Sequence, residues 1–134
     1  MKLKEKINAI IYTVHGDNSQ DAILELENYG LIYKEKKLDI KGINKEEVEC
    51  LARSTEHGIM DLMGRNTREF KRIASRILDM SYKQVVEHVV ENPTILKTPI
   101  VYTTKGIVVG LLIDDIENLA ALTAGKRKKV KIDE

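Results

Sequence analysis

Few residues of this chain could carry chemistry, and they lie far apart in the sequence. The 134 residues include one cysteine, Cys50, and three histidines, at positions 15, 57 and 88. Three glutamates within the four residues before Cys50 disfavour its thiolate, which is the nucleophilic form of the side chain. No two histidines have the spacing of ligands on one helix, and none has a cysteine partner. The sequence predicts a partly buried, unreactive cysteine, no metal site and no disulfide within the chain.

Four arginines recur at spacings of three and four residues, on the side of a predicted helix opposite to its apolar positions. Such a stripe can contact phosphates or an acidic partner, and it is more often a solvated helix face. Both interpretations stay open. The arginines are Arg65, Arg68, Arg72 and Arg76, and the apolar positions are Phe70, Ile73 and Ile77.

The composition is that of an ordinary globular protein of one domain, spanning residues 1–134. Hydrophobic residues make up 43% and charged residues 32% of the chain, and the net charge is +1. This balance gives no bulk electrostatic reason to expect nucleic acid or a membrane as partner. No apolar run approaches the ~20 residues that span a bilayer, and no signal peptide is recognisable, so we expect a cytoplasmic protein. The basic segment 125–134 is predicted to be a frayed tail.

The first third of the chain predicts a strand, a helix and a second strand. The apolar, β-branched run at 8–14 is the first strand, and the helix at 19–28 ends at Gly30. The second strand is expected at 31–40. Because short connections join these elements, the two strands should be parallel and the crossover right-handed.

The middle of the chain, about residues 44–91, predicts a helical insertion. Asn44, Thr67 and Ser81 are expected to cap three helices, and a short apolar segment lies at 59–63. The expected buried positions of these helices are Val48, Leu51, Ala52, Thr55, Phe70, Ile73, Ile77, Val85, Val86, Val89 and Val90.

The last third predicts a β-hairpin and a final helix. Strands at 99–103 and 107–112 flank Thr104-Lys105-Gly106, which is a turn sequence. The final helix begins near Asp114 or Asp115 and should bury Ile116, Leu119, Ala120 and Leu122. The order β-α-β, helices, β-β-α predicts an α/β protein with a thioredoxin-like fold, a four-stranded mixed sheet and a helical insertion.

In a thioredoxin-like fold, the turn between the first strand and the first helix is where a reactive cysteine sits. The amide groups at the start of the helix stabilise its thiolate there. In this chain the turn reads His15-Gly16-Asp17-Asn18-Ser19-Gln20-Asp21 and has no cysteine. The sequence thus predicts a redox scaffold without its redox group.

Several segments, in matching order, are similar to the arsenate reductase family and its regulatory branch, Spx. The segment 91–101, Glu-Asn-Pro-Thr-Ile-Leu-Lys-Thr-Pro-Ile-Val, resembles the family segment HPxLLRRPII, and 55–58, Thr-Glu-His-Gly, resembles TEDG of Spx. The same frame places Phe70 on a family phenylalanine, and Tyr12-Thr13 matches the join between strand and active loop. The resemblance covers roughly residues 8–122. It implies a cis peptide bond between Thr98 and Pro99.

The resemblance also implies that the catalytic groups of the family are missing. The family's nucleophilic cysteine falls on Asp17, the second cysteine of Spx on Gln20, and the oxyanion-binding arginine before Pro99 on Thr98. Asp17 and Asp21 would also repel an anionic substrate from this helix terminus. We therefore expect no arsenate reductase activity, no dithiol switch and no cofactor, with Asp17, Gln20, Thr98 and Pro99 forming only a vestigial loop site.

Two functions remain open from the sequence. In Spx, the glycine matching Gly58 lies where the insert docks on the C-terminal domain of the RNA polymerase α subunit, so the resemblance implies a regulator that binds this domain. Its partner-binding residues would be Glu56, Gly58, Ile59 and Met60, and DNA would be contacted only indirectly. The alternative is a degenerate reductase-fold protein that binds a small ligand or another protein at the vacated loop, 15–19. An exposed apolar surface at one of the two places would distinguish them.

Overall fold

The structure is a computed structural model that describes residues 6–126, and its centre is a four-stranded sheet. The strand order is β2-β1-β3-β4, with β1 parallel to β2 and antiparallel to β3, and β3 antiparallel to β4. The strands are β1 (Ala9–Thr13), β2 (Tyr33–Lys37), β3 (Ile100–Thr103) and β4 (Gly106–Val109). The expected α/β fold with a mixed sheet, including the parallel first pair, is confirmed.

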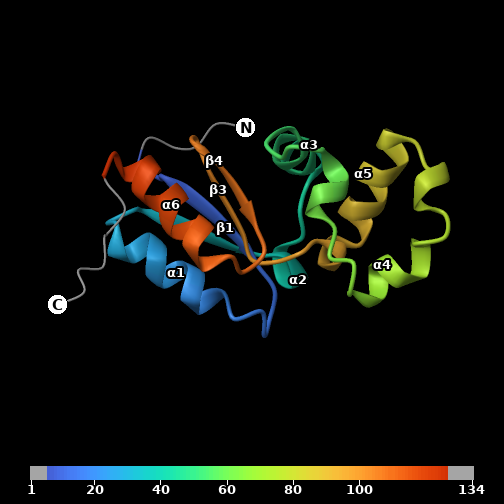
Figure 1. Cartoon of the computed structure of the whole chain (residues 1–134). Coiled ribbons are helices and arrows are strands. Elements are labelled where there is room, and N and C mark those ends of the chain that lie inside the picture. The colour runs from blue at the N-terminus through green and yellow to red at the C-terminus, as the bar shows by residue number, and fades with distance from the viewer. Residues whose placement is uncertain (1–5, 127–134) are drawn as a thin grey trace.

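Helices α1 (Ser19–Asn28) and α6 (Ile113–Ala124) cover one face of the sheet (Figure 1). Their apolar sides pack with each other and with Ile11 and Val101 in one buried cluster. Leu122, predicted to be buried, is instead 59% exposed. At 3.6 residues per turn, a position six residues after Ile116 points away from the side that Ile116 and Ala120 bury.

The helices between β2 and β3 form a second body beside one end of the sheet (Figure 1), and we call residues 38–95 the helical insert. Alternate strand residues supply the two faces, so Tyr12 and Ile100 belong to the cluster shared with the insert. The elements of the insert are α2 (Leu38–Lys41), α3 (Lys45–Arg53), η1 (Ile59–Leu62), α4 (Arg68–Ile73), η2 (Ile77–Asp79), α5 (Tyr82–Glu91) and η3 (Pro93–Ile95).

The three predicted helix starts in the insert are confirmed. The Asn44 side chain accepts the Glu47 amide at 2.8 Å, and the Ser81 hydroxyl accepts the Gln84 amide at 3.2 Å. Both form reciprocal capping boxes, and Thr67 caps α4 through the Phe70 amide at 3.1 Å. Local capping chemistry thus sets where these helices begin.

Several boundaries differ from the prediction, among them the end of the last strand, which lies at Val109 and not at 112. The second strand ends at Lys37, because residues 38–41 form α2, which Gly42 terminates with a φ of 68°. Helix α4 ends at Ile73, and Ile77 reaches the core from the separate turn η2. Thr55 lies beyond the end of α3 and is only half-buried. In each case a short turn replaces the continued element that periodicity predicts.

The insert is tied to the sheet where residues 62–64 cross residues 95–97. The Gly64 amide donates to the Ile95 carbonyl at 2.8 Å, and the Lys97 amide donates to the Leu62 carbonyl at 2.8 Å. A Cβ on Gly64 would lie 2.8 Å from the Thr67 methyl and 3.1 Å from the Ile95 oxygen. Only glycine permits so close a crossing.

The described part of the chain ends two residues after α6. The predicted basic tail lies, from residue 127 onward, outside the described residues, and α6 ends at Gly125 with a φ of 70°. Within residues 6–126, no helix combines the length and apolar character that crossing a membrane requires.

Candidate functional site

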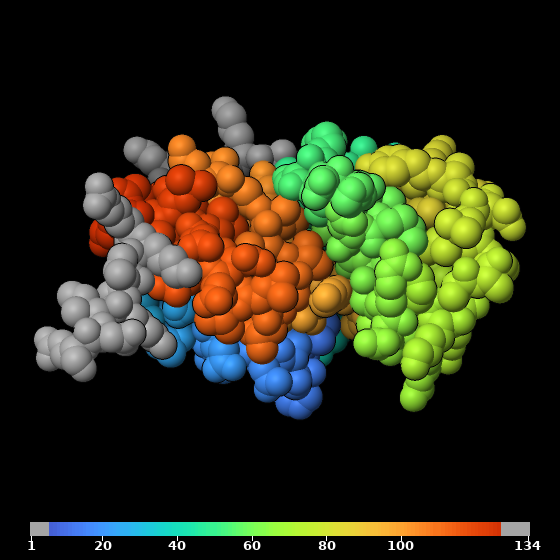
Figure 2. Space-filling model, viewed as in Figure 1, coloured from blue at the N-terminus to red at the C-terminus, as the bar shows by residue number. Residues whose placement is uncertain are grey.

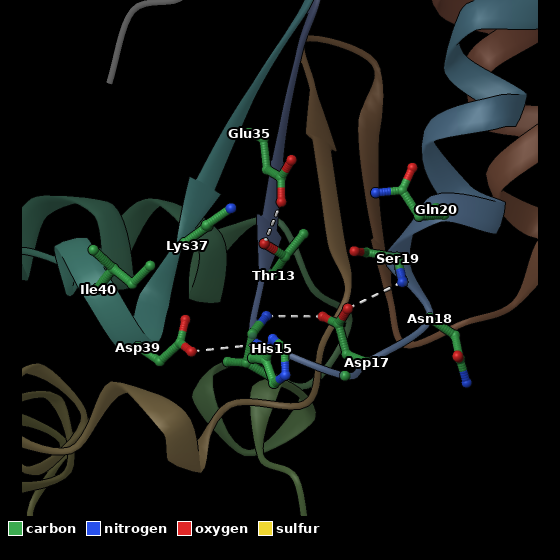
Figure 3. Close-up of a pocket in the computed structure, with 12 residues that line it drawn as sticks. Thr13, His15, Asp17, Asn18, Ser19, Gln20, Glu35, Lys37, Asp39 and Ile40 are labelled. Carbon is green, nitrogen blue, oxygen red and sulfur yellow. Dashed lines mark hydrogen bonds between the residues drawn. The ribbon is translucent and has the colours of Figure 1, made fainter.

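The α1 loop, residues 14–19, borders a hollow of about 350 Å³ between β1, α1 and the end of β2 (Figure 3). The Thr13 hydroxyl donates to Glu35 at 2.8 Å, and the His15 amide donates to the Asp39 carboxylate at 3.3 Å. Carboxylates of Asp17, Glu35 and Asp39 line the hollow, and the cationic side chain among its lining residues is Lys37. The surroundings therefore disfavour an anionic substrate.

Both oxygens of Asp17 are engaged by backbone amides of the loop itself. Oδ2 accepts the Val14 amide at 2.9 Å, and Oδ1 accepts the Ser19 amide at 3.0 Å (Figure 3). Asn18 precedes α1 in the left-handed region, with a φ of 60°, and makes no side-chain capping bond. Asp17 therefore holds the loop closed, and its carboxylate is turned to the chain rather than to a substrate.

The structure places the other residues of the predicted vestigial site around the same loop. Gln20 lines the first hollow, and Thr98 lines a neighbouring hollow of about 530 Å³. Val14 borders both hollows, which makes them adjacent. The Thr98–Pro99 peptide bond is cis, which confirms the implied conformation.

The insert loop, residues 54–61, follows α3, includes the first residues of η1 and is held by its own short hydrogen bonds. The Thr55 hydroxyl lies 2.8 Å from the Ala52 carbonyl and 2.7 Å from the Gly58 carbonyl. The His57 amide donates to Asp61 Oδ2 at 2.8 Å. Gly58 has a φ of 85°, and a Cβ added there would meet no atom within 4 Å. The loop is thus fixed in shape and open to solvent at its glycine.

The predicted partner-binding residues of the insert loop divide into two kinds. The Glu56 side chain is 86% exposed, and that of the neighbouring His57 is 71% exposed. Ile59 is only 8% exposed and belongs to the core, and Met60 is half-buried against it. The exposed apolar surface that would distinguish the two candidate functions is therefore not formed by Ile59 and Met60, because these side chains anchor the loop from inside.

A buried polar cluster that sequence reasoning missed joins the insert to the sheet. The Tyr12 hydroxyl donates to Glu47 Oε2 at 2.9 Å, and Lys36 forms an ion pair with Oε1 of the same carboxylate. Tyr12 is fully buried and Glu47 is 6% exposed. Burial, followed by the adjacent Glu47 carboxylate, raises the pKa of Tyr12 far above its usual value. A glutamate in the first turn of a predicted helix gave no signal that it would be buried.

Cys50 lies beside this cluster and has a defined partner. Its Sγ donates to the Tyr102 hydroxyl at 3.3 Å, and the thiol is buried. The hydrogen bond with Cys50, together with burial, raises the pKa of Tyr102. Cys50 is predicted to be partly buried and is in fact buried, with 7% of its surface exposed, and its surroundings are those of a packing residue.

The arginine stripe is only partly as predicted. Arg68, Arg72 and Arg76 are exposed, but the Arg65 guanidinium carbon lies 5.4 Å from the centre of the Phe70 ring. Arg65 precedes α4 and stacks on Phe70 instead of lying opposite to it. Among residues 6–126, no group of three or more His, Cys, Asp or Glu side chains is placed to hold a metal ion.

Comparison with known proteins gives one family. The model of the ArsC family matches residues 22–119, a stretch that begins after Gln20. The global transcriptional regulator Spx of Streptococcus agalactiae is 26% identical over 91 residues, which are 68% of this chain and 66% of that protein. The regulatory protein MgsR of Bacillus subtilis is 26% identical over 85 residues, 63% of this chain and 68% of MgsR. The match thus spans just under two thirds of the Spx relative.

Solved structures show the same fold at lower identity. A putative ArsC family related protein from Bacteroides fragilis superposes with a TM-score of 0.74 at 15% identity, over 86% of this chain and 99% of its own. An arsenate reductase from Vibrio cholerae superposes with a TM-score of 0.73 at 18% identity, over 86% of this chain and 99% of its own. At such identities the likeness concerns the fold alone.

Proposed function

Because this chain belongs to the ArsC family, we propose that it is a non-enzymatic, Spx-like transcriptional regulator. Its partner is the C-terminal domain of the RNA polymerase α subunit, which it contacts through the insert loop. It acts in the cytoplasm, without a thiol switch. Two relatives, Spx and MgsR, are regulatory proteins by name, and this supports a regulatory role for this chain.

The observation that carries the proposal is the open backbone of the insert loop at Gly58. A partner can approach this backbone closely, because no atom lies within 4 Å of the space that a Cβ would fill. The side chains of Glu56 and His57 extend into solvent beside Gly58, whereas the buried side chain of Ile59 anchors the loop in the core. The loop therefore presents a preformed shape, which reduces the entropy lost on binding.

The proposal that the protein is not an enzyme rests on the α1 loop. Asp17 occupies the position that the resemblance assigns to the nucleophile, and both of its oxygens accept backbone amides. Cys50 is the single cysteine of the chain and lies in the insert, against Tyr102. Neither residue offers a nucleophile to the hollow beside α1. Arsenate or disulfide turnover by the purified protein would contradict this part.

A pair of matched glycine substitutions tests the partner surface. Gly16 and Gly58 both follow a histidine, have φ values of 81° and 85°, and have open space around an added Cβ. An arginine at either position should cost folding stability through backbone strain, about 1–3 kcal/mol at Gly58, whose ψ of −153° lies in a region that essentially only glycine adopts. Only Gly58→Arg should abolish binding to the isolated C-terminal domain of the polymerase α subunit, because only there would the side chain block the partner.

The measurement is isothermal titration calorimetry with that isolated domain, at protein concentrations of tens of micromolar. Wild type and Gly16→Arg should bind equally under reducing and oxidising conditions, and circular dichroism should confirm that both variants are folded. Absence of binding by the wild-type protein would overturn the proposal. It would favour a ligand-binding protein that uses the 350 Å³ hollow beside the α1 loop.

A further inference from the structure

A groove of about 410 Å³ separates the insert loop from the corner where β4 leads into α6. Glu56 and Asp61 stand on the insert side of the groove, and Leu112 and Asp115 stand on the α6 side. Ile107 and Val109 of β4 lie between them and are half-buried. In Figure 2 the orange surface of the β4–α6 region faces the green surface of the insert along the line where the two bodies meet.

The groove combines an apolar floor with carboxylates from both walls. Ile107 and Val109 point to the same face of the sheet because strand residues alternate, and Leu112 extends the apolar floor with a side chain that is 48% exposed. The carboxylates belong to Glu56, Asp61 and Asp115, and the His57 ring lies beside the first two, 3.8 Å from Glu56 Oε1 and 3.3 Å from Asp61 Oδ2. Among the described residues that line the groove, none is a lysine or an arginine.

The position of β4 keeps one side of the groove accessible. β4 is the outermost strand on its side of the described sheet and pairs with β3 alone. The groove therefore lies beside an unpaired strand edge, where a partner can approach without displacing an element of this chain.

We infer that this groove receives an apolar segment of the partner that carries a lysine or arginine side chain. The inference rests on the proposed function and extends its contact surface from the insert loop to Leu112 and Asp115. Apolar contacts on the floor exclude water, and the three carboxylates surround the cation that enters with the segment. Asp115 has no ion pair among the described residues, so it is the carboxylate on which a cation of the partner would depend most.

Two neighbouring aspartates give a matched test. Asp114 and Asp115 are both exposed in the first turn of α6, so a lysine at either position costs the helix a similar loss of favourable charge. Only Asp115 lines the groove. We expect Asp115→Lys to weaken binding of the polymerase domain roughly ten-fold, and Asp114→Lys less than two-fold. Raising the salt concentration should weaken binding by the wild type more than binding by Asp115→Lys.

A second pair tests the apolar floor without changing charge. Leu112→Ala removes contacts inside the groove and should weaken binding roughly five-fold, whereas Leu111→Ala, outside the groove, should leave binding unchanged. If Gly58→Arg abolishes binding while Asp115→Lys and Leu112→Ala match their controls, the groove is not part of the surface and the proposed function stands. If the wild-type protein does not bind the domain, both the proposed function and the inference about the groove are wrong.

Discussion

The α1 loop and the insert loop contain similar residues, but these residues make different contacts in the two loops. Each has a histidine, a glycine at a φ above 80° and an aspartate that accepts a backbone amide of the same loop. In the α1 loop both oxygens of Asp17 bind amides, and the loop closes over the start of α1. In the insert loop Glu56 and His57 extend into solvent. The carboxylate of Asp17 is thus occupied by its own loop, whereas Glu56 and His57 lie 3.8 Å apart on the surface, with His57 also 3.3 Å from Asp61, and keep most of their side-chain area exposed to a partner.

The largest expected effect concerns the buried polar cluster of Tyr12, Lys36 and Glu47, the junction that joins the helical insert to the sheet. Glu47→Ala should lower the free energy of unfolding by about 3 kcal/mol, because it leaves the buried Tyr12 hydroxyl without an acceptor and Lys36 without its ion pair. Urea unfolding followed by circular dichroism measures the change. Glu46→Ala, in the same turn and exposed, should cost less than about 0.5 kcal/mol. Equal losses for the two variants would show that the junction does not hold the insert.

An intermediate effect compares the two aspartates directly. Asp17→Ala removes the acceptors of two backbone amides, whereas Asp61→Ala removes the acceptor of one, that of His57. We expect losses of about 2 and about 1 kcal/mol of unfolding free energy, respectively. Thermal and urea unfolding of both variants measure them. A loss at Asp61 as large as that at Asp17 would remove the distinction between a closed and an open loop.

The smallest expected effect is a pH dependence of the folding stability, which should arise from Tyr12 in the buried junction and not from the two loops. Burial and Glu47 raise the pKa of Tyr12 in the folded protein, so above pH ~10 the unfolded chain loses this proton while the folded protein keeps it. The unfolded state then binds fewer protons, and stability falls as pH rises. Between pH 9 and 11 wild-type stability should fall by about 1 kcal/mol more than that of Tyr12→Phe. Parallel pH profiles would contradict this.

Local sequence signals predicted the parts of the fold that local chemistry controls. The caps at Asn44, Thr67 and Ser81 lie where the side-chain types indicated, and the apolar, β-branched run at 8–14 identified the central strand. Errors arose where a turn interrupts a periodic pattern. Ile40, predicted in a strand, lies in α2 and is 70% exposed, because the chain turns into a helix at Leu38.

The sequence indicated where the candidate site lies, but not the contacts that its residues make. The resemblance identified the insert loop and the α1 loop, yet it did not indicate that Ile59 is buried or that Asp17 binds two amides. The bond between Tyr12 and Glu47 joins residues 35 positions apart, and no short-range pattern encodes such a contact. The same holds for the groove, whose two walls come from the insert and from α6.

A cysteine introduced at position 17 would remove both amide acceptors at once, since a thiol is a weak acceptor. A lineage that acquired a thiol there would pass through a less stable protein, and it would do so before any catalytic benefit existed. Stabilising substitutions elsewhere would have to come first. The closed loop therefore opposes the appearance of a reactive residue at this position during evolution.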